Sequence, residues 1–239
     1  LFAIIDSIKR TDSVGVTELA NRLDLAKSTV HKHLVSLERN NYVVNENGQY
    51  RLGLQFFNTG IHVRNQYDVY HAAKARIDKL AHDVDEAVWL IVQENGMGIF
   101  IYGVAQNESF TFDSMIGTRA YLHANSAGKA ILAYLPENEV EDIVDQHGLP
   151  AQTENTITDR ETLFDELEAI RDRKYAMNFE EDLRGLHAIA APIIDDGWPI
   201  AAVTIAGAAN RLTKERIENE LCEPLLEAID DIELRLVYG

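Results

Sequence analysis

The dipeptide Asn47-Gly48 separates two short runs of β-forming residues, and this pattern predicts a β-hairpin. Both residues accept the positive φ that a two-residue turn of this kind requires. Apolar residues before the hairpin recur at helical spacing and predict three helices, over 2–10, 16–23 and 27–40. A three-residue turn between the second and third helices completes a helix-turn-helix. Helix, helix-turn-helix and hairpin in this order predict a winged helix over residues 1–53.

The third predicted helix has one apolar stripe and one polar face. Val30, Leu34 and Leu37 follow the i, i+4, i+7 spacing of a buried stripe. The opposite face carries hydroxyl, imidazole and ammonium groups, at Lys27, Ser28, Thr29, His31 and Lys32. Such side chains early in a helix suit contact with DNA phosphates and with base edges in the major groove. Arg51, on the predicted hairpin, is placed to reach a flanking phosphate or the minor groove. The alternative is an ordinary solvated helix face.

Charge is distributed unevenly along the chain. Residues 1–67 carry eight basic and six acidic side chains, a net of +2, whereas the remainder carries 14 basic and 33 acidic side chains, a net of −19. This asymmetry favours an amino-terminal part that meets a polyanion and a carboxy-terminal part that does not. An acidic surface that only aids solubility is the alternative. The excess of acidic residues over lysines also predicts a halophilic protein, because concentrated salt screens the repulsion between carboxylates.

The rest of the chain mixes predicted helices and strands around one mainly antiparallel sheet, which is the pattern of an α+β fold. The expected helices are 54–70, 72–84, 127–135, 137–146, 160–173 and 213–236. The expected strands are 89–92, 99–104, 110–115, a strand around 176, 188–194 and 200–206. We expect a winged helix-turn-helix domain over 1–53, a linker helix over 54–70 and a second domain over 71–239.

Seven segments of the chain carry a family pattern. In the winged helix they are Thr-Glu-Leu-Ala-Asn-Arg-Leu at 17–23, Lys-Ser-Thr-Val-His-Lys-His-Leu at 27–34, Leu-Glu-Arg-Asn-Asn-Tyr at 37–42 and Tyr-Arg-Leu-Gly at 50–53. In the second domain they are 122–130, with an Ala-Gly-Lys-Ala core, 156–159 and 185–193. Together these segments resemble the IclR family of transcriptional regulators.

The resemblance implies an architecture and partners. The winged helix-turn-helix would read a pseudo-palindromic site on double-stranded DNA, and the linker helix would help a homodimer form. Pairing of two dimers into a tetramer stays open. The second domain would be a GAF-like α/β effector-binding domain, whose central antiparallel sheet holds a small organic ligand on its concave side.

The resemblance also indicates where the ligand would bind. In relatives the positions equivalent to Asn178, Ala188 and Thr204 contact a small carboxylate or aromatic effector. Relatives often have Asp at the first of these positions. Because Asn178 removes that charge, we expect an acidic ligand, such as a carboxylate.

A predicted helix start offers a second part of the same pocket. Its first residues are Ser126, Ala127 and Gly128, and their backbone N–H groups suit an anion. Ordinary capping of the helix by Asn125 or Ser126 is the alternative. His123 and His187 are candidate donors, with a structural role as the alternative.

The sequence lacks the motifs of the common enzyme classes. It has no Gly-x-Ser-x-Gly elbow, no glycine-rich phosphate loop and no dinucleotide-binding glycine motif. Cys222, the one cysteine, lies in a predicted helix, and His31 and His33 would point to different helix faces. One acidic cluster is expected to form a solvated helix end and its turn: His82, Asp83, Asp85 and Glu86. We expect no enzyme, no metal site and no cofactor.

The prediction as a whole is a DNA-binding transcriptional regulator whose DNA affinity a small organic effector controls. No apolar run reaches the length of a membrane helix, so the expected location is the cytoplasm. The alternative is a DNA-binding dimer whose second domain serves oligomerisation only, without a ligand. Repression and activation are both compatible with the sequence.

Overall fold

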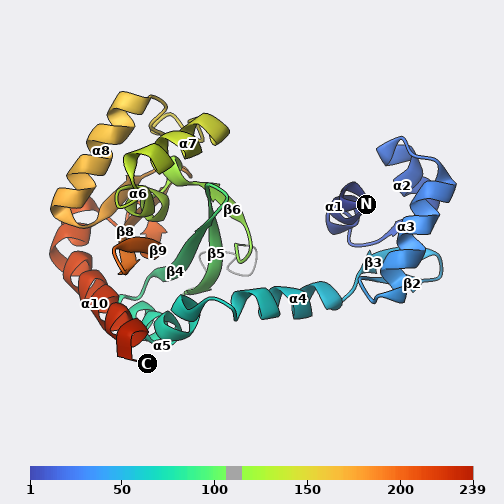
Figure 1. Ribbon diagram of the computed structural model, residues 1–239, viewed down its shortest axis with the longest axis horizontal. Helices are drawn as coiled ribbons and strands as arrows, with labels where there is room; N and C mark the ends of the chain where they lie inside the picture. Colours follow the sequence, from blue (N-terminus) through green and yellow to red (C-terminus); the bar gives the residue numbers. More distant parts are fainter. Residues whose placement is uncertain (106–114, 239) are drawn as a thin grey trace. The chain divides into compact units, whose positions relative to one another are not determined.

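The computed structural model describes residues 1–105 and 115–238 (Figure 1). The chain divides into two compact units, Leu1–Gln66 and Tyr67–Gly239. Each unit has its own hydrophobic core, and each is described here by itself.

The first unit is a winged helix. Its elements are α1 (Phe2–Lys9), β1 (Val14–Gly15), α2 (Val16–Leu23), α3 (Lys27–Arg39), β2 (Val43–Glu46), β3 (Gln49–Leu52) and α4 (Gln55–Arg64). The expected hairpin is confirmed: β2 and β3 are antiparallel, and Asn47 and Gly48 have φ values of 57° and 87° in the turn between them. The expected helix-turn-helix is also confirmed, because α2 and α3 begin and end within one residue of their predicted bounds.

The core of this unit includes the stripe that the sequence predicted. Val30, Leu34 and Leu37 of α3 are buried against apolar residues of α1, α2 and the hairpin. The two-residue strand β1 was not expected, since the segment before α2 read as a polar break. Val14 of β1 pairs with Tyr50 of β3, so the wing is a three-stranded sheet in the order β1-β3-β2.

Helix α4 differs from the other helices of this unit because none of its residues is buried. Phe57, Val63 and the preceding Leu54 are exposed. The helix is also shorter than expected: it ends at Arg64 rather than near residue 70. The next helix begins at Asp68, four residues before its predicted start.

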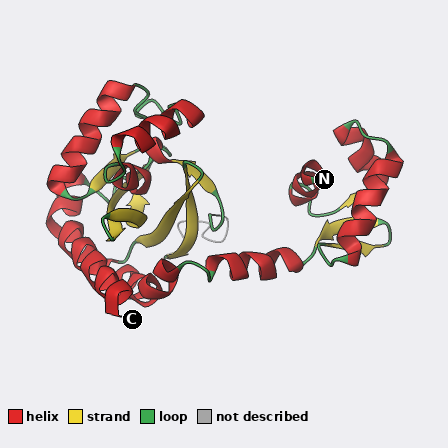
Figure 2. Ribbon diagram, in the orientation of Figure 1, coloured by secondary structure: helices red, strands yellow, loops and turns green. Residues whose placement is uncertain are grey.

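In the part of the chain that the structure describes, the second unit is built on a six-stranded antiparallel sheet in the order β6-β5-β4-β9-β8-β7. Figure 2 shows strands in yellow and helices in red. The strands of this unit are β4 (Ala87–Glu94), β5 (Met97–Val104), β6 (Arg119–Tyr121), β7 (Ala176–Phe179), β8 (Leu186–Asp195) and β9 (Trp198–Ala208). Its helical elements are α5 (Asp68–Val84), η2 (Leu122–Ala124), α6 (Ser126–Leu132), α7 (Glu137–His147), α8 (Arg160–Arg173), α9 (Lys214–Arg216), η3 (Ile217–Leu221) and α10 (Cys222–Tyr238). The expected strand at 110–115 lies outside the described residues, except for Met115, which is in a turn.

Alternation along the strands divides the core of this unit into two layers. Val88, Leu90 and Val92 of β4 face the layer that contains α5 and α10. Trp89 and Ile91 face the opposite layer, in which α6, α7 and α8 lie. Successive side chains of a strand point to opposite faces of the sheet, so the strand serves both layers.

The expected closing helix over 213–236 is present as the contiguous elements α9, η3 and α10, and the π-helical turn η3 directly precedes the turn of α10 that contains Pro224. One expectation for this unit was wrong. Glu86 is buried rather than solvated. Its carboxylate accepts hydrogen bonds from Arg211 and Arg216, each 2.7 Å long, which compensate the charge.

Candidate functional site

The polar face of α3 is the first candidate site. Opposite the buried stripe, the predicted DNA-contacting residues of this helix are all exposed: Lys27, Ser28, Thr29, His31 and Lys32. Helix α3 follows Ala26, which provides no side-chain cap. The N–H groups of a first turn have no partner within the helix and carry partial positive charge. This end of α3 can therefore accept an anionic oxygen.

The ammonium groups of Lys27 and Lys32 on this face are available for contact with an anion. In residues 1–105 and 115–238, neither Lys27 nor Lys32 forms an ion pair. Arg51 differs, because its guanidinium lies 2.8 Å from Glu46 Oε1 across the hairpin. Both of those side chains are exposed, so the pair is weak and contact with a phosphate can exchange it.

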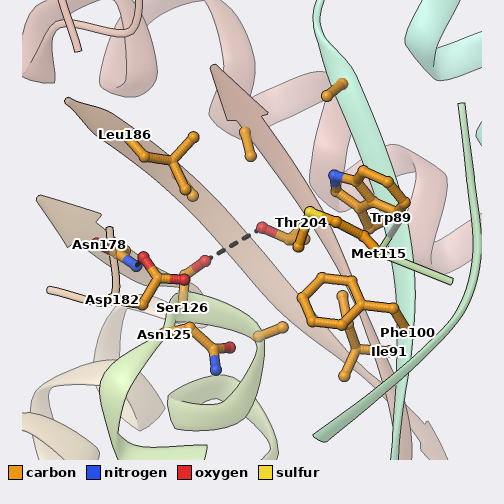
Figure 3. A pocket seen from close by; sticks show the side chains of 14 residues that line it. Trp89, Ile91, Phe100, Met115, Asn125, Ser126, Asn178, Asp182, Leu186 and Thr204 are labelled. Atoms are coloured by element: carbon orange, nitrogen blue, oxygen red, sulfur yellow. Dashed lines mark hydrogen bonds between the residues drawn. The ribbon is translucent and has the colours of Figure 1, made fainter. Parts of the chain in front are cut away.

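The second candidate site is a pocket on the α6 side of the large sheet (Figure 3). It encloses about 450 Å³ of empty space, open solvent at its mouth included. Strands β4, β5, β7, β8 and β9, the start of α6 and the turns that hold Met115 and Asp182 supply its lining. The lining residues are Ala87, Trp89, Ile91, Phe100, Met115, Asn125, Ser126, Ala127, Asn178, Asp182, Leu186, Ala188, Thr204 and Ala206.

Aromatic side chains form one end of the pocket. The rings of Trp89 and Phe100 are 5.6 Å apart and perpendicular, an edge-to-face arrangement. Gly103 pairs with Trp89 in the sheet, and a Cβ at this glycine would overlap the indole. The absence of a side chain at Gly103 of β5 therefore leaves space for the indole of Trp89.

Polar side chains form the other end. The hydroxyls of Ser126 and Thr204 are 3.1 Å apart, and Thr204 also donates to the carbonyl of Ile189. Asn178 donates from Nδ2 to Asp182 Oδ1 over 2.8 Å, and its Oδ1 accepts from the backbone N–H of Glu181. Three elements distant in sequence thus meet at this end (Figure 3).

The structure brings five of the six predicted pocket residues together. Ser126, Ala127, Asn178, Ala188 and Thr204 all line the pocket, and Gly128 does not. A Cβ at Gly128 would overlap the backbone of Leu122, so this glycine allows α6 to pack against the preceding turn. Its backbone N–H donates to Asn125 Oδ1 over 2.8 Å. The capping alternative is therefore the one observed, and this N–H does not point to a ligand.

The sequence reasoning missed nine of the fourteen lining residues, including Trp89 and Phe100, and Asp182 is the one among them with an ionisable side chain. Asp182 lies in the turn between β7 and β8. This turn lies beside the pocket because of the order of the strands in the sheet, which the local sequence does not reveal. Burial raises the pKa of the Asp182 carboxyl, while the hydrogen bond from Asn178 opposes the rise. The expectation of an acidic ligand assumed a pocket without a carboxylate, and Asp182 removes that premise.

A buried ion pair lies behind the polar end. Lys129 of α6 contacts both carboxylate oxygens of Glu181, at 2.7 and 2.6 Å. Burial raises the pKa of Glu181, and the Lys129 ammonium opposes that rise. Glu166 lies 3.6 Å from the same ammonium and also pairs with Arg173. Lys129, whose charge acts on Asp182, is thus already paired.

Both candidate histidines contact backbone carbonyls. His123 Nε2 lies 3.2 Å from the carbonyl of Pro150, and His187 Nδ1 lies 2.7 Å from the carbonyl of Leu212. Neither histidine lines the pocket. Burial lowers the pKa of His123, which favours its neutral form.

Two further properties concern the described part of the chain. No group of three or more His, Cys, Asp and Glu side chains there could hold a metal ion. Every helix in the same residues is too short or too polar to cross a bilayer. Cys222 is partly buried, and burial raises the pKa of its thiol. A thiol is a poor nucleophile in that state.

Comparison with known proteins covers almost the whole chain. The family model "IclR helix-turn-helix domain" matches residues 1–46, and the model "Bacterial transcriptional regulator IclR C-terminal" matches residues 61–234. The "Probable HTH-type transcriptional regulator ArcR" of Halobacterium salinarum is 32% identical over 98% of this chain and 90% of its own length. The HTH-type transcriptional regulator KipR of Bacillus subtilis is 30% identical over 99% and 95%.

A solved structure extends the similarity to the fold. The crystal structure of the IclR protein of Thermotoga maritima superimposes with a TM-score of 0.85 at 32% identity. The match covers 98% of this chain and 96% of that one. The similarity therefore includes the winged helix and the unit that contains the pocket.

Proposed function

We propose the function of this chain from one premise: it belongs to the IclR family of transcriptional regulators. The chain is accordingly a transcriptional regulator with a helix-turn-helix domain. Our proposal adds how the chain contacts DNA, what controls that contact and how many copies take part.

The polar face of α3 is the part that enters the major groove. Lys27, at the uncapped start of the helix, and Lys32 contact phosphates, while His31 reads a base edge. Arg51 on the wing exchanges Glu46 for a flanking phosphate. The observation that carries this proposal is the set of exposed, unpaired cations in the described unit Leu1–Gln66, on the side of α3 opposite its core stripe.

Two copies act together on a pseudo-palindromic site. Support for a dimer comes from α4, which exposes Phe57 and Val63 and buries none of its residues within one chain. A second copy of α4 would cover these apolar side chains and so remove them from water. Two winged helices would then face two half-sites of one duplex.

A small organic effector controls the DNA affinity. Support comes from the pocket of the second unit, which combines an aromatic end with converging polar side chains from α6, β7 and β9. An effector changes DNA affinity only if it binds two states of the dimer with different strength. The alternative is a second domain that serves oligomerisation without any ligand.

Binding to genomic DNA tests the central part of this proposal. The purified chain, mixed with sheared DNA of its own genome, should retain specific fragments that a Lys27→Ala/Lys32→Ala variant does not retain. Addition of a metabolite extract should change the fragment affinity of the unsubstituted chain. Failure to retain any fragment would overturn the DNA-binding role, and an affinity indifferent to the extract would favour the oligomerisation alternative.

A further inference from the structure

The polar end of the pocket directs most of its side-chain hydrogen-bond donors at the protein itself. Thr204 donates to the carbonyl of Ile189, so the hydroxyl hydrogen between Thr204 and Ser126 comes from Ser126. Asn178 donates one of its two amide hydrogens to Asp182, and Asn125 donates one of its two to the carbonyl of Tyr121. Both hydroxyl hydrogens and one hydrogen of each amide are thus directed at the protein.

Acceptor capacity remains at the same end. A carboxylate can accept about four hydrogen bonds. Asn178 donates to Asp182 Oδ1, and the backbone N–H groups of Asp182 and Leu183 also hydrogen-bond to this carboxyl, so its acceptor positions are only partly used. The oxygen of Ser126, having donated its hydrogen to Thr204, keeps lone pairs for a ligand. Both oxygens lie on the pocket lining (Figure 3). A ligand that enters therefore meets acceptors.

The charges around Asp182 reinforce this selection. Lys129 is saturated by both oxygens of Glu181 and has Glu166 at 3.6 Å, while Arg173 pairs with Glu166. Both cations therefore already have carboxylate partners. Burial raises the pKa of Asp182, while the hydrogen bond from Asn178 and the Lys129 ammonium oppose the rise. In its ionised form Asp182 would repel a carboxylate ligand.

We infer that this pocket selects a ligand with a flat apolar body and a terminal nitrogen group that donates hydrogen bonds, an amide or an amidine, over a carboxylate of the same shape. The inference rests on one part of the proposed function, namely that the pocket of the second unit binds a ligand. The flat body lies against Trp89 and Phe100, and the donating group reaches Asp182 and Ser126.

Three probes of equal shape test the inference. Benzoate, benzamide and benzamidine share one planar skeleton and differ in the charge and in the number of donors at one end. The chain has two tryptophans, and Trp198 lies outside the pocket lining. A Trp198→Phe chain therefore leaves Trp89 as the only tryptophan, and its fluorescence reports binding inside the pocket.

We expect benzamide and benzamidine to bind the Trp198→Phe chain at least about ten-fold more tightly than benzoate. Adding Asp182→Asn preserves the shape of the side chain and removes its charge, and should reduce the preference for benzamidine over benzoate by about ten-fold. Adding Asp142→Asn instead, on the exposed side of α7, should leave the preference unchanged.

Three results would overturn the inference: tighter binding of benzoate, a preference that survives Asp182→Asn, or no response of Trp89 to any of the probes. Its failure is distinguishable from failure of the proposed function. Retention of genomic fragments tests the DNA-binding role and needs none of the three probes. Tighter binding of benzoate would overturn the inferred ligand preference but would still show that the pocket binds a ligand.

Discussion

Lys129 Nζ lies 2.6 Å from Glu181 Oε2, and both side chains are buried. The contact joins α6, which supplies Ser126 to the pocket, to the turn after β7, which supplies Asp182. One buried ion pair thus holds together two of the elements that form the polar end. The positions of the pocket oxygens depend on it.

Substitution of Lys129 should be strongly destabilising. Lys129→Met leaves Glu181 buried without its cation, which costs about 3–5 kcal/mol of unfolding free energy. The double variant Lys129→Met/Glu181→Leu should lose less than Lys129→Met alone, because no charge is then left unpaired. Urea unfolding measures both. Lys74→Met is the control, since its pair with Asp78 is exposed and worth about 0–1 kcal/mol; equal losses at the two lysines would contradict the account.

The stability contributed by His123 should depend on pH. Burial lowers the pKa of the folded histidine below its unfolded value of about 6.5, so the unfolded chain takes up the proton first as the pH falls. The contribution is fully present above about pH 6.5 and decreases as the pH falls from there through the folded pKa. The gap in unfolding free energy between the unsubstituted chain and His123→Gln should therefore shrink from pH 7.5 to 5.5. A constant gap would show that His123 does not titrate on unfolding.

The acidic second unit should be stabilised by salt. Its 33 acidic and 14 basic residues repel one another on balance, and at about 1 M KCl the Debye length of about 3 Å screens that repulsion. Thermal unfolding from dilute buffer to about 1 M KCl should show a rising midpoint. An unchanged midpoint would contradict the halophilic interpretation.

His31→Ala should change which sequences the chain prefers. If its imidazole reads a base edge, removing it costs about 1–3 kcal/mol on the preferred site and little on a site altered at that base pair. Anisotropy titrations with a set of single-base variants of a retained fragment measure this. An equal loss on every fragment would instead indicate a phosphate contact.

Local patterns were sufficient to predict the winged helix. Gly15 before α2, the stripe of Val30 and Leu34 in α3, and the Asn47-Gly48 turn are all signals contained in a few consecutive residues. Strand β1 escaped prediction because two residues carry no periodicity, and only their pairing with β3 makes them a strand.

Distant partners account for what the sequence did not predict. Glu86 is buried because Arg211 and Arg216 reach it from more than 120 positions away. Asp182 lines the pocket because the sheet places β7 beside β8 and leads the intervening turn to the start of α6. No signal within the local sequence distinguishes these two carboxylates from the many solvated ones.

The salt dependence of DNA binding tests the central claim most directly. A plot of log affinity against log salt concentration, for a retained genomic fragment, counts the phosphates that the protein neutralises. Lys32→Ala should weaken binding to all fragments and reduce the slope by about one, whereas Lys79→Ala, at an exposed position of helix α5, should leave the slope unchanged. An unaltered slope for Lys32→Ala would contradict the placement of α3 against the DNA backbone.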